Sequence, residues 1–331
     1  MLDEKRKLMI AAAIVVVVLS IGASVYAQNT KADDVVIRAS VNKDCSGTPW
    51  FAGVEKGFFK NAGVNFEDIG QIAYPQRAAA FASGQMDVFD EHPSTLINLI
   101  KAGAPIIGVA QSGDEPVDGD LSKMHMHWLV RDDSPIKTVA DIAKQDRPVK
   151  IGTLALGICV DTEDNALLRK NNIPKDKIEY VVLPDPEQIQ ALKQGLIDVA
   201  ILHPPFFTAA ESQGGVRVLA TSTDAFGSAG GTSLLFFTKD FIKNHPDAVR
   251  KFIKAYKATE QWANTHRDEA GALTAKDIGL DKSTVHYYSN SGKVNDAQLQ
   301  YWIDSLVADG VIKKGEFKPK DLYTDEFKDV W

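Results

Sequence analysis

The sequence predicts a two-lobed α/β protein, because strand-like and helix-like segments alternate, a repeat divides the chain, and two extended segments separate the repeated units. Alternation with short connections predicts parallel strands joined by right-handed crossovers. The chain has 331 residues, 44% hydrophobic and 24% charged, which is enough for about two packed domains. Its net charge of −7 argues against a nucleic-acid partner, since no excess of cations is available for phosphates.

The N-terminal segment has the pattern of an export signal. Residues 8–27 carry no charge, follow three cations at positions 5–7, and end on small residues at Ala27. This predicts a signal peptide over 1–27. An uncleaved membrane anchor is the alternative, because about 20 apolar residues also span a bilayer. Either way, we expect the rest of the chain outside the cytoplasm, in the periplasm or on the outer face of the cytoplasmic membrane.

A repeat with an offset of 111 residues organises the remaining chain. Segment 75–93 aligns without gaps on segment 186–204, with seven of 19 positions identical, where chance would give about one. The same offset brings the strand-like residues 35–41 close to the strand-like residues 147–153. The repeat therefore predicts two similar lobes, each built as strand, helix, strand, helix, strand.

Each predicted lobe has two strand-to-helix corners that contain a proline. The corners are Tyr74-Pro75 and His92-Pro93 in the first lobe, and Asp185-Pro186 and His203-Pro204 in the second. We predict Asp185 as the N-cap of a helix that ends at Gly195. Open α/β sheets bind ligands beyond the carboxyl ends of their strands, where helix N-termini point. These corners therefore predict the ligand site.

Two extended segments, 124–133 and 231–241, join the lobes and suggest a two-strand hinge beside the cleft. The chain then returns to the first lobe, because apolar residues between Pro246 and Tyr256 recur at helical spacing. We divide the chain into a signal peptide or anchor (1–27), the first part of lobe 1 (28–123), lobe 2 with the hinge strands (124–238) and the return to lobe 1 (239–331).

Four segments carry a resemblance to a known family. They are PWFAGVEKGFFKNAGV (49–64), AAAFASGQMDV (78–88), WLVRDDSPIKTVADI (128–142) and FTKDFIKNHPDAVRKFIKAY (237–256). In this order they resemble the ABC-importer solute-binding proteins for nitrate, sulfonates, taurine and thiamine precursors. The resemblance implies a type II periplasmic-binding-protein fold that closes on one small molecule and docks, as a monomer, on a permease with its ATPase subunits. We expect no cofactor and no enzymatic activity, because the sequence carries no positive evidence of catalysis.

The predicted corners are acidic, which limits the charge of the ligand that they can bind. They carry Asp90, Glu91, Asp114, Glu115 and Asp161, whereas Lys43 and Arg77 are the obvious cations nearby. A desolvated anion beside unpaired carboxylates is costly, so a neutral or cationic ligand such as an aminopyrimidine is favoured. A sulfonate or nitrate anion is the alternative, as are a pyrimidine-synthase-like enzyme and a ligand sensor on the same fold. The cysteine-rich motif of the pyrimidine-synthase relatives does not occur in the sequence.

We predict eleven ligand-binding residues: Ser46, Thr48, Trp50, Tyr74, Asp90, Glu91 and His92 in the first lobe, and Thr153, Asp185, His203 and Phe206 in the second. The repeat places His92 and His203 at equivalent corners, where two imidazoles could close on one ligand. Alternatively, each histidine only shapes the turn before its helix. For Asp90 and Glu91 the alternative is contact with solvent alone.

We predict no metal site. Asp90 and His92 lie on one face of a strand and could share an ion, but His125 and His127 fit ordinary paired strand residues. The glycine-containing loop 152–157 could bind an anion with backbone N–H groups, although it is not a P-loop. The sequence has no motif for a catalytic nucleophile with its base.

The two cysteines, Cys45 and Cys159, fall in the first loop of each predicted lobe. A disulfide between them would tie the lobes together. Because ligand release requires the lobes to part, we expect the two thiols not to be joined in the working protein.

Overall fold

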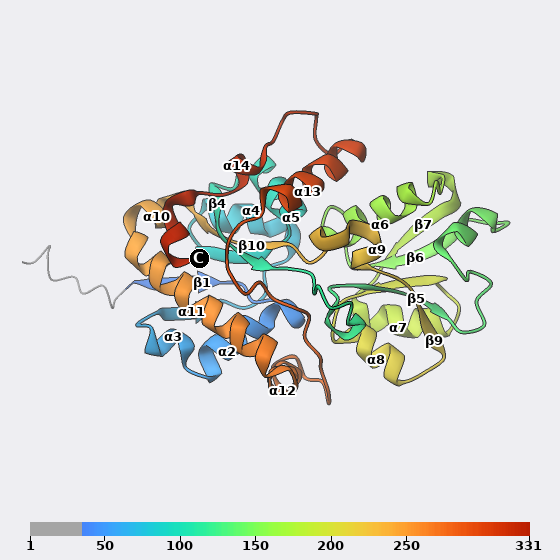
Figure 1. The fold of residues 1–331 in the computed structure, drawn as a ribbon, viewed down its shortest axis with the longest axis horizontal. Coiled ribbons are helices and arrows are strands. Elements are labelled where there is room, and N and C mark those ends of the chain that lie inside the picture. The colour runs from blue at the N-terminus through green and yellow to red at the C-terminus, as the bar shows by residue number, and fades with distance from the viewer. Residues whose placement is uncertain (1–34) are drawn as a thin grey trace, which may run out of the picture.

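The computed structural model describes residues 35–331, so the predicted signal peptide or anchor lies outside the described residues. The described chain forms two five-stranded sheets in separate lobes (Figure 1). Helices cover both sheets, which confirms the predicted two-lobed α/β fold. In this part of the chain, no helix is both long and apolar enough to cross a membrane.

The first sheet has the strand order β2-β1-β3-β10-β4. Its strands are β1 (Val36–Ala39), β2 (Asn65–Asp68), β3 (Val88–Glu91), β4 (Ile106–Gly113) and β10 (Ser233–Thr238). Strand β1 pairs in parallel with β2 and β3, as the alternating pattern predicts. Strand β10 comes much later in the chain and pairs antiparallel with β3 and β4.

The second sheet repeats this topology in the order β7-β6-β8-β5-β9. Its strands are β5 (His127–Arg131), β6 (Val149–Thr153), β7 (Ile178–Val182), β8 (Val199–Leu202) and β9 (Val216–Thr221). Strand β8 takes the place of β3, and the antiparallel β5 takes the place of β10. Because β3 starts at Val88 and β8 at Val199, the two positions differ by the 111 residues of the repeat.

The helices divide between the lobes in the same way. The first lobe holds α2 (Thr48–Glu55), α3 (Phe58–Asn61), α4 (Tyr74–Ala82), α5 (Pro93–Lys101), α10 (Lys239–Asn244), α11 (Pro246–Thr265), α12 (Arg267–Ile278), α13 (Asp296–Ala308) and α14 (Pro319–Leu322). The second holds α6 (Cys159–Lys170), α7 (Asp185–Lys193), α8 (Phe206–Ser212) and α9 (Ser222–Phe226). Helices α4 and α7 also start 111 residues apart, and each follows a strand of its own lobe.

The predicted hinge segments do not run freely between the lobes, because each segment contains a paired strand of one sheet. Residues 233–238 form β10 inside the first sheet, and residues 127–131 form β5 inside the second. Each is held on both sides by ladder hydrogen bonds, so the crossings between lobes are the shorter pieces beside these strands (Figure 1). A boundary after residue 238 therefore assigns to lobe 2 a strand that pairs in the first sheet.

The start of α7 corrects the predicted cap. The helix begins at Asp185 itself, and Pro184 is the N-cap. The carboxylate of Asp185 accepts hydrogen bonds from Gln188 Nε2 at 3.1 Å and lies 3.3 Å from Nδ1 of His203. The carboxylate therefore makes no capping hydrogen bond to the N–H groups of the first turn of α7. It contacts His203 at the other corner of the second lobe.

Candidate functional site

A cavity and an adjoining cleft lie between the two lobes. The inner cavity, of about 30 Å³, is lined by Asn42, Asp44, Cys45, Ser46, Tyr74, Asp90, Glu91, His92, His125, Leu154, Ile158, Cys159, His203, Ser233, His286 and Tyr288. The outer cleft, of about 570 Å³, is lined by Asn42, Lys43, Asp44, Gln71, Ile72, Ala73, Tyr74, Arg77, Leu154, Pro184, Asp185, Pro186, Phe206, Ile278 and Leu280. Four residues line both spaces, so the inner cavity is the deep end of the cleft.

The first lobe contributes three consecutive polar residues from the end of β3. Asp90 accepts hydrogen bonds from Ser112 Oγ at 2.5 Å and Tyr256 Oη at 2.6 Å, so both carboxylate oxygens are engaged. Glu91 accepts from Tyr74 Oη at 3.0 Å. Both acids line the cavity and are buried, which excludes simple exposure to solvent.

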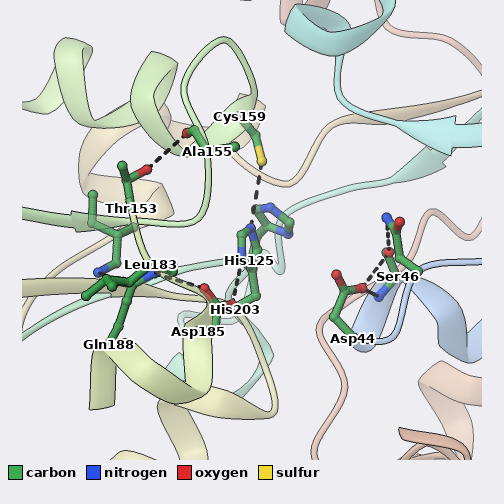
Figure 2. Close-up of polar contacts among 12 residues, drawn as sticks. Asp44, Ser46, His125, Thr153, Ala155, Cys159, Leu183, Asp185, Gln188 and His203 are labelled. Carbon is green, nitrogen blue, oxygen red and sulfur yellow. Dashed lines mark hydrogen bonds and ion pairs between the residues drawn. The ribbon is translucent and has the colours of Figure 1, made fainter. Parts of the chain in front are cut away.

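Four imidazoles and a thiol meet where the two lobes face each other. His92 comes from the β3–α5 corner, His203 from the β8–α8 corner, His125 from the segment before β5, and His286 from the segment after α12. The His92 and His125 rings are 4.3 Å apart between centroids, and the His125 and His203 rings 5.0 Å. Cys159 Sγ lies 3.7 Å from His203 Nε2, and Figure 2 shows His125 beside this pair.

The electrostatics of the cavity follow from burial. Burial raises the pKa of Glu91 to about 7, although the guanidinium of Arg77 opposes this. Burial lowers the pKa of His92 to about 3 and that of His286 to about 3, so both imidazoles are neutral near pH 7. Burial also acts to lower the pKa of His203, but the carboxylate of Asp185 outweighs it and raises that pKa above its usual value.

Arg77 is a buried cation at the border of the cleft. Its Nη2 donates to Asn42 Oδ1 at 2.8 Å and its Nε to the carbonyl of Ile72 at 2.9 Å. The guanidinium also packs on the ring of Tyr74, 3.8 Å from the centroid. These contacts direct two of its donor groups to the protein, which reduces what remains for an anionic ligand.

Six of the eleven predicted site residues line the inner cavity: Ser46, Tyr74, Asp90, Glu91, His92 and His203. Asp185 lines the outer cleft and lies 3.3 Å from His203. Phe206 is the first residue of α8 and lines the outer cleft. The oxygens of Ser46 and Asp44 point to each other, with Ser46 Oγ donating to Asp44 Oδ1 at 2.6 Å (Figure 2).

Three predicted site residues do not line either space. Trp50 is buried in the first-lobe core, where its ring lies 4.8 Å from that of Tyr256. Thr48 is fully buried and shares a 2.6 Å hydrogen bond with Thr274 of α12. Thr153 donates to the carbonyl of Ala155 at 3.1 Å, so it shapes the loop after β6 (Figure 2).

The glycine-containing loop after β6 is not open to an anion. Asp161 Oδ1 accepts hydrogen bonds from the backbone N–H groups of Gly157 and Ile158, both at 3.0 Å. This carboxylate already occupies the N–H groups that the loop pattern offered. The possibility that loop 152–157 binds an anion through its backbone N–H groups is therefore contradicted at Gly157.

Sequence reasoning missed His125 and His286 as cavity residues. The signal for His125 is the segment MHMHW, although its pattern fits two ordinary strand histidines equally well. The structure separates them, because His127 stacks on Phe207 at 3.8 Å between centroids, away from the cavity. His286 lies in a polar segment with no pattern around it, and only the fold brings it to His125. Cys45 and Cys159 are both buried free thiols.

A deep cavity closed by equivalent corners of two lobes defines a two-lobed solute-binding protein. Residues 45–270 match the family described as NMT1/THI5 like, and the chain belongs to that family. A protein assigned as aliphatic sulfonates-binding in Escherichia coli is 26% identical over 216 residues, covering 65% of this chain and 63% of that protein. The chain thus spans just under two thirds of that curated relative.

Solved structures show the same fold. The periplasmic aliphatic sulphonate binding protein SsuA from Escherichia coli has a TM-score of 0.68 and 21% identity, covering 88% of this chain and 92% of that one. A ligand-binding component of an ABC-type import system from Staphylococcus aureus, solved with zinc bound, has a TM-score of 0.70 and 13% identity, covering 89% and 99%. The resemblance read from the four sequence segments is confirmed.

Proposed function

We propose that this protein is an exported solute-binding protein, which captures a small molecule between its lobes and delivers it to the permease of an ABC importer. One observation carries the proposal: the cavity and the cleft are lined by equivalent strand-to-helix corners of two lobes. A ligand that contacts both corners favours the closed arrangement by its differential affinity. The family membership and the names of the relatives support the same role.

The lining favours a neutral or cationic organic ligand, such as an aminopyrimidine. Asp44 and Asp185 reach the outer cleft, and Tyr74 and Phe206 offer aromatic faces for stacking. Arg77 is the buried cation there, and two of its donor groups are already engaged. An amino group of the ligand would find carboxylate acceptors, whereas an anion would lie beside them at a cost.

A sulfonate or nitrate anion is the second candidate, and the names of the relatives favour it. Lys43 lines the outer cleft and would be its nearest partner with Arg77. The cleft thus offers two cations against two carboxylates. Direct binding measurements separate the candidates, because the charge of the preferred ligand is opposite in the two cases.

Isothermal titration with an aminopyrimidine, taurine, an alkanesulfonate and nitrate tests the proposal. We expect saturable one-to-one binding of the aminopyrimidine, and about 2- to 10-fold weaker binding in Phe206→Ala, which loses one stacking face. Leu196→Ala is the matched control, because Leu196 is an exposed apolar residue of the same lobe. Selective binding of a sulfonate or nitrate overturns the ligand class.

Two further outcomes would overturn the role itself. Chemical turnover of the bound molecule during the titration would indicate an enzyme. Unchanged uptake of the preferred ligand by cells that lack the gene would indicate a sensor or another non-transport role. We expect neither, because the family membership and the names of the relatives support a binding role.

A further inference from the structure

The deep end of the cavity gathers metal-binding side chains from separate parts of the chain. His92, His125 and Cys159 each offer one ligand atom, and these atoms all lie within 4.8 Å of one another. All three residues are buried, at 4%, 4% and 3% exposure. His92 follows β3 as the N-cap of the first-lobe helix α5, whereas Cys159 begins a second-lobe helix. The group therefore spans the boundary between the lobes.

The hydrogen bonds of these residues leave nitrogen atoms free for a ligand. His92 Nδ1 donates to the carbonyl of Thr232 at 2.8 Å, which leaves its Nε2 with a lone pair. A histidine that binds a metal usually donates its other N–H to a backbone carbonyl or carboxylate in this way. Among the described residues, His125 Nε2 is buried without any hydrogen-bond partner.

A purely structural role explains this arrangement poorly. A buried polar atom without a partner costs about 1–3 kcal/mol, and His286 Nε2 is a second such nitrogen in the same cluster. His125 Nδ1 lies only 3.1 Å from His286 Nδ1, so one proton serves two nitrogens. Apolar side chains of the same size would avoid these costs in a core.

The size of the cavity and the ligand types of the cluster suit a metal ion. A cavity of about 30 Å³ holds one or two water-sized groups and no organic ring. Imidazole and thiolate together favour borderline transition metals such as Zn²⁺ over Mg²⁺ or Ca²⁺.

We propose that His92, His125 and Cys159 bind one transition-metal ion of the Zn²⁺ class at the deep end of the cavity. Coordination replaces the thiol proton of Cys159, which leaves to solvent, so the thiolate sulfur and two imidazole nitrogens hold the ion. The fourth coordination position of the ion faces His203 (Figure 2). The Nε2 of His203 lies 3.7 Å from Cys159 Sγ, and its Nδ1 lies 3.3 Å from the carboxylate of Asp185. The inference concerns the ion alone and does not depend on delivery to a permease.

Titration of the tag-free, metal-stripped protein with Co²⁺ tests this proposal directly. Co²⁺ occupies Zn²⁺ sites and gives a sulfur-to-metal charge-transfer band when a thiolate is bound. We expect one equivalent of Co²⁺ to produce the band, Cys159→Ser to abolish it, and Cys45→Ser to keep it. Cys45 is the matched control, because it is the other buried thiol on the cavity wall.

The histidine ligands have a matched control as well. We expect His125→Gln to weaken Zn²⁺ binding at least 10-fold in a calorimetric titration, and His127→Gln to leave it unchanged, since His127 bonds to Glu211 outside the cavity. X-ray absorption of the wild-type zinc complex needs no variant and should show one sulfur with two or more nitrogens. Absence of saturable one-to-one binding, a sulfur-free zinc shell, or a band that survives Cys159→Ser overturns the proposal.

Discussion

Asp164 in α6 is a buried carboxyl whose environment makes it sensitive to pH. Its two oxygens accept hydrogen bonds from Trp128 Nε1 and Tyr180 Oη, both at 2.7 Å. Burial still raises the pKa of Asp164 to about 6, with Asp161 adding to the effect. The folded protein therefore binds this proton more tightly than the unfolded chain, and the stability it contributes is lost as the pH rises through about 6.

Replacing Asp164 with Asn removes this titration and keeps a group that can bond both neighbours. We expect the stability of Asp164→Asn relative to the wild type to rise by about 2 kcal/mol between pH 4 and pH 7, because the ionisation penalty of the wild type appears over that range. Urea denaturation at a series of pH values measures the difference. A difference that stays constant with pH would contradict the assignment.

Individual residues also show what a single sequence can specify. His92, His203, Tyr74 and Asp185 can be predicted near the cleft because prolines mark the strand-to-helix corners, and the structure places these corners at the inner cavity or the outer cleft. Trp50 was misassigned because an aromatic residue near a corner can face inward or outward, and the rotation of α2 against α11 decides this. His286 could not be found, since its position depends on a segment that returns from the far end of the chain.

At the scale of elements, α7 is tied to its sheet by one buried side chain. Gln188 Oε1 accepts from the backbone N–H of Ile201 in β8 at 3.2 Å, and its Nε2 donates to the carbonyl of Leu183 at 3.1 Å. Gly152 in β6 permits this approach, because a Cβ there would lie 2.7 Å from Gln188 Oε1. The glycine read from sequence as part of an anion-binding loop thus serves helix packing.

We expect Gln188→Ala to lower the free energy of unfolding by about 1–3 kcal/mol, since it leaves buried backbone groups without a partner. Gln190→Ala is the matched control, because Gln190 lies on the exposed face of the same helix and should cost less than about 0.5 kcal/mol. Chemical denaturation of both variants provides the comparison. Equal losses in the two variants would show that the link to β8 does not account for the effect.

The repeat explains why the elements were more predictable than the site. Local sequence patterns that occur twice produce the strands β3 and β8 and the helices α4 and α7. The pattern in one lobe therefore supports the secondary structure predicted for the other. The antiparallel strands β5 and β10 lie outside the repeated segments, and their pairing inside the sheets depends on contacts between distant parts of the chain. For the same reason, local sequence patterns do not predict which residues on or beside these strands line the cavity.

At the scale of the whole molecule, the closed arrangement is held by contacts across the lobe boundary. Asn98 Nδ2 of α5 donates to the carbonyl of Gly157 at 2.7 Å, and Arg169 Nη2 of α6 donates to Ser305 Oγ of α13 at 2.7 Å. Arg169 also forms an ion pair with Asp309. These groups are partly exposed, so each contact contributes only about 0.2–1 kcal/mol. Removing these contacts alone therefore lowers the stability of the closed arrangement by only about 1 kcal/mol.

The labelling of Cys159 by a thiol reagent reports lobe opening, because this thiol is buried at the boundary in the closed structure. In a Cys45→Ser background, we expect the double variant Asn98→Ala/Arg169→Ala to react about 5-fold faster, in line with a loss of about 1 kcal/mol from the closed state. Arg147→Ala is the control, because Arg147 pairs with Asp198 inside the second lobe at 2.7 Å. If Arg147→Ala accelerates labelling equally, or the double variant reacts at the parent rate, these contacts do not govern closure.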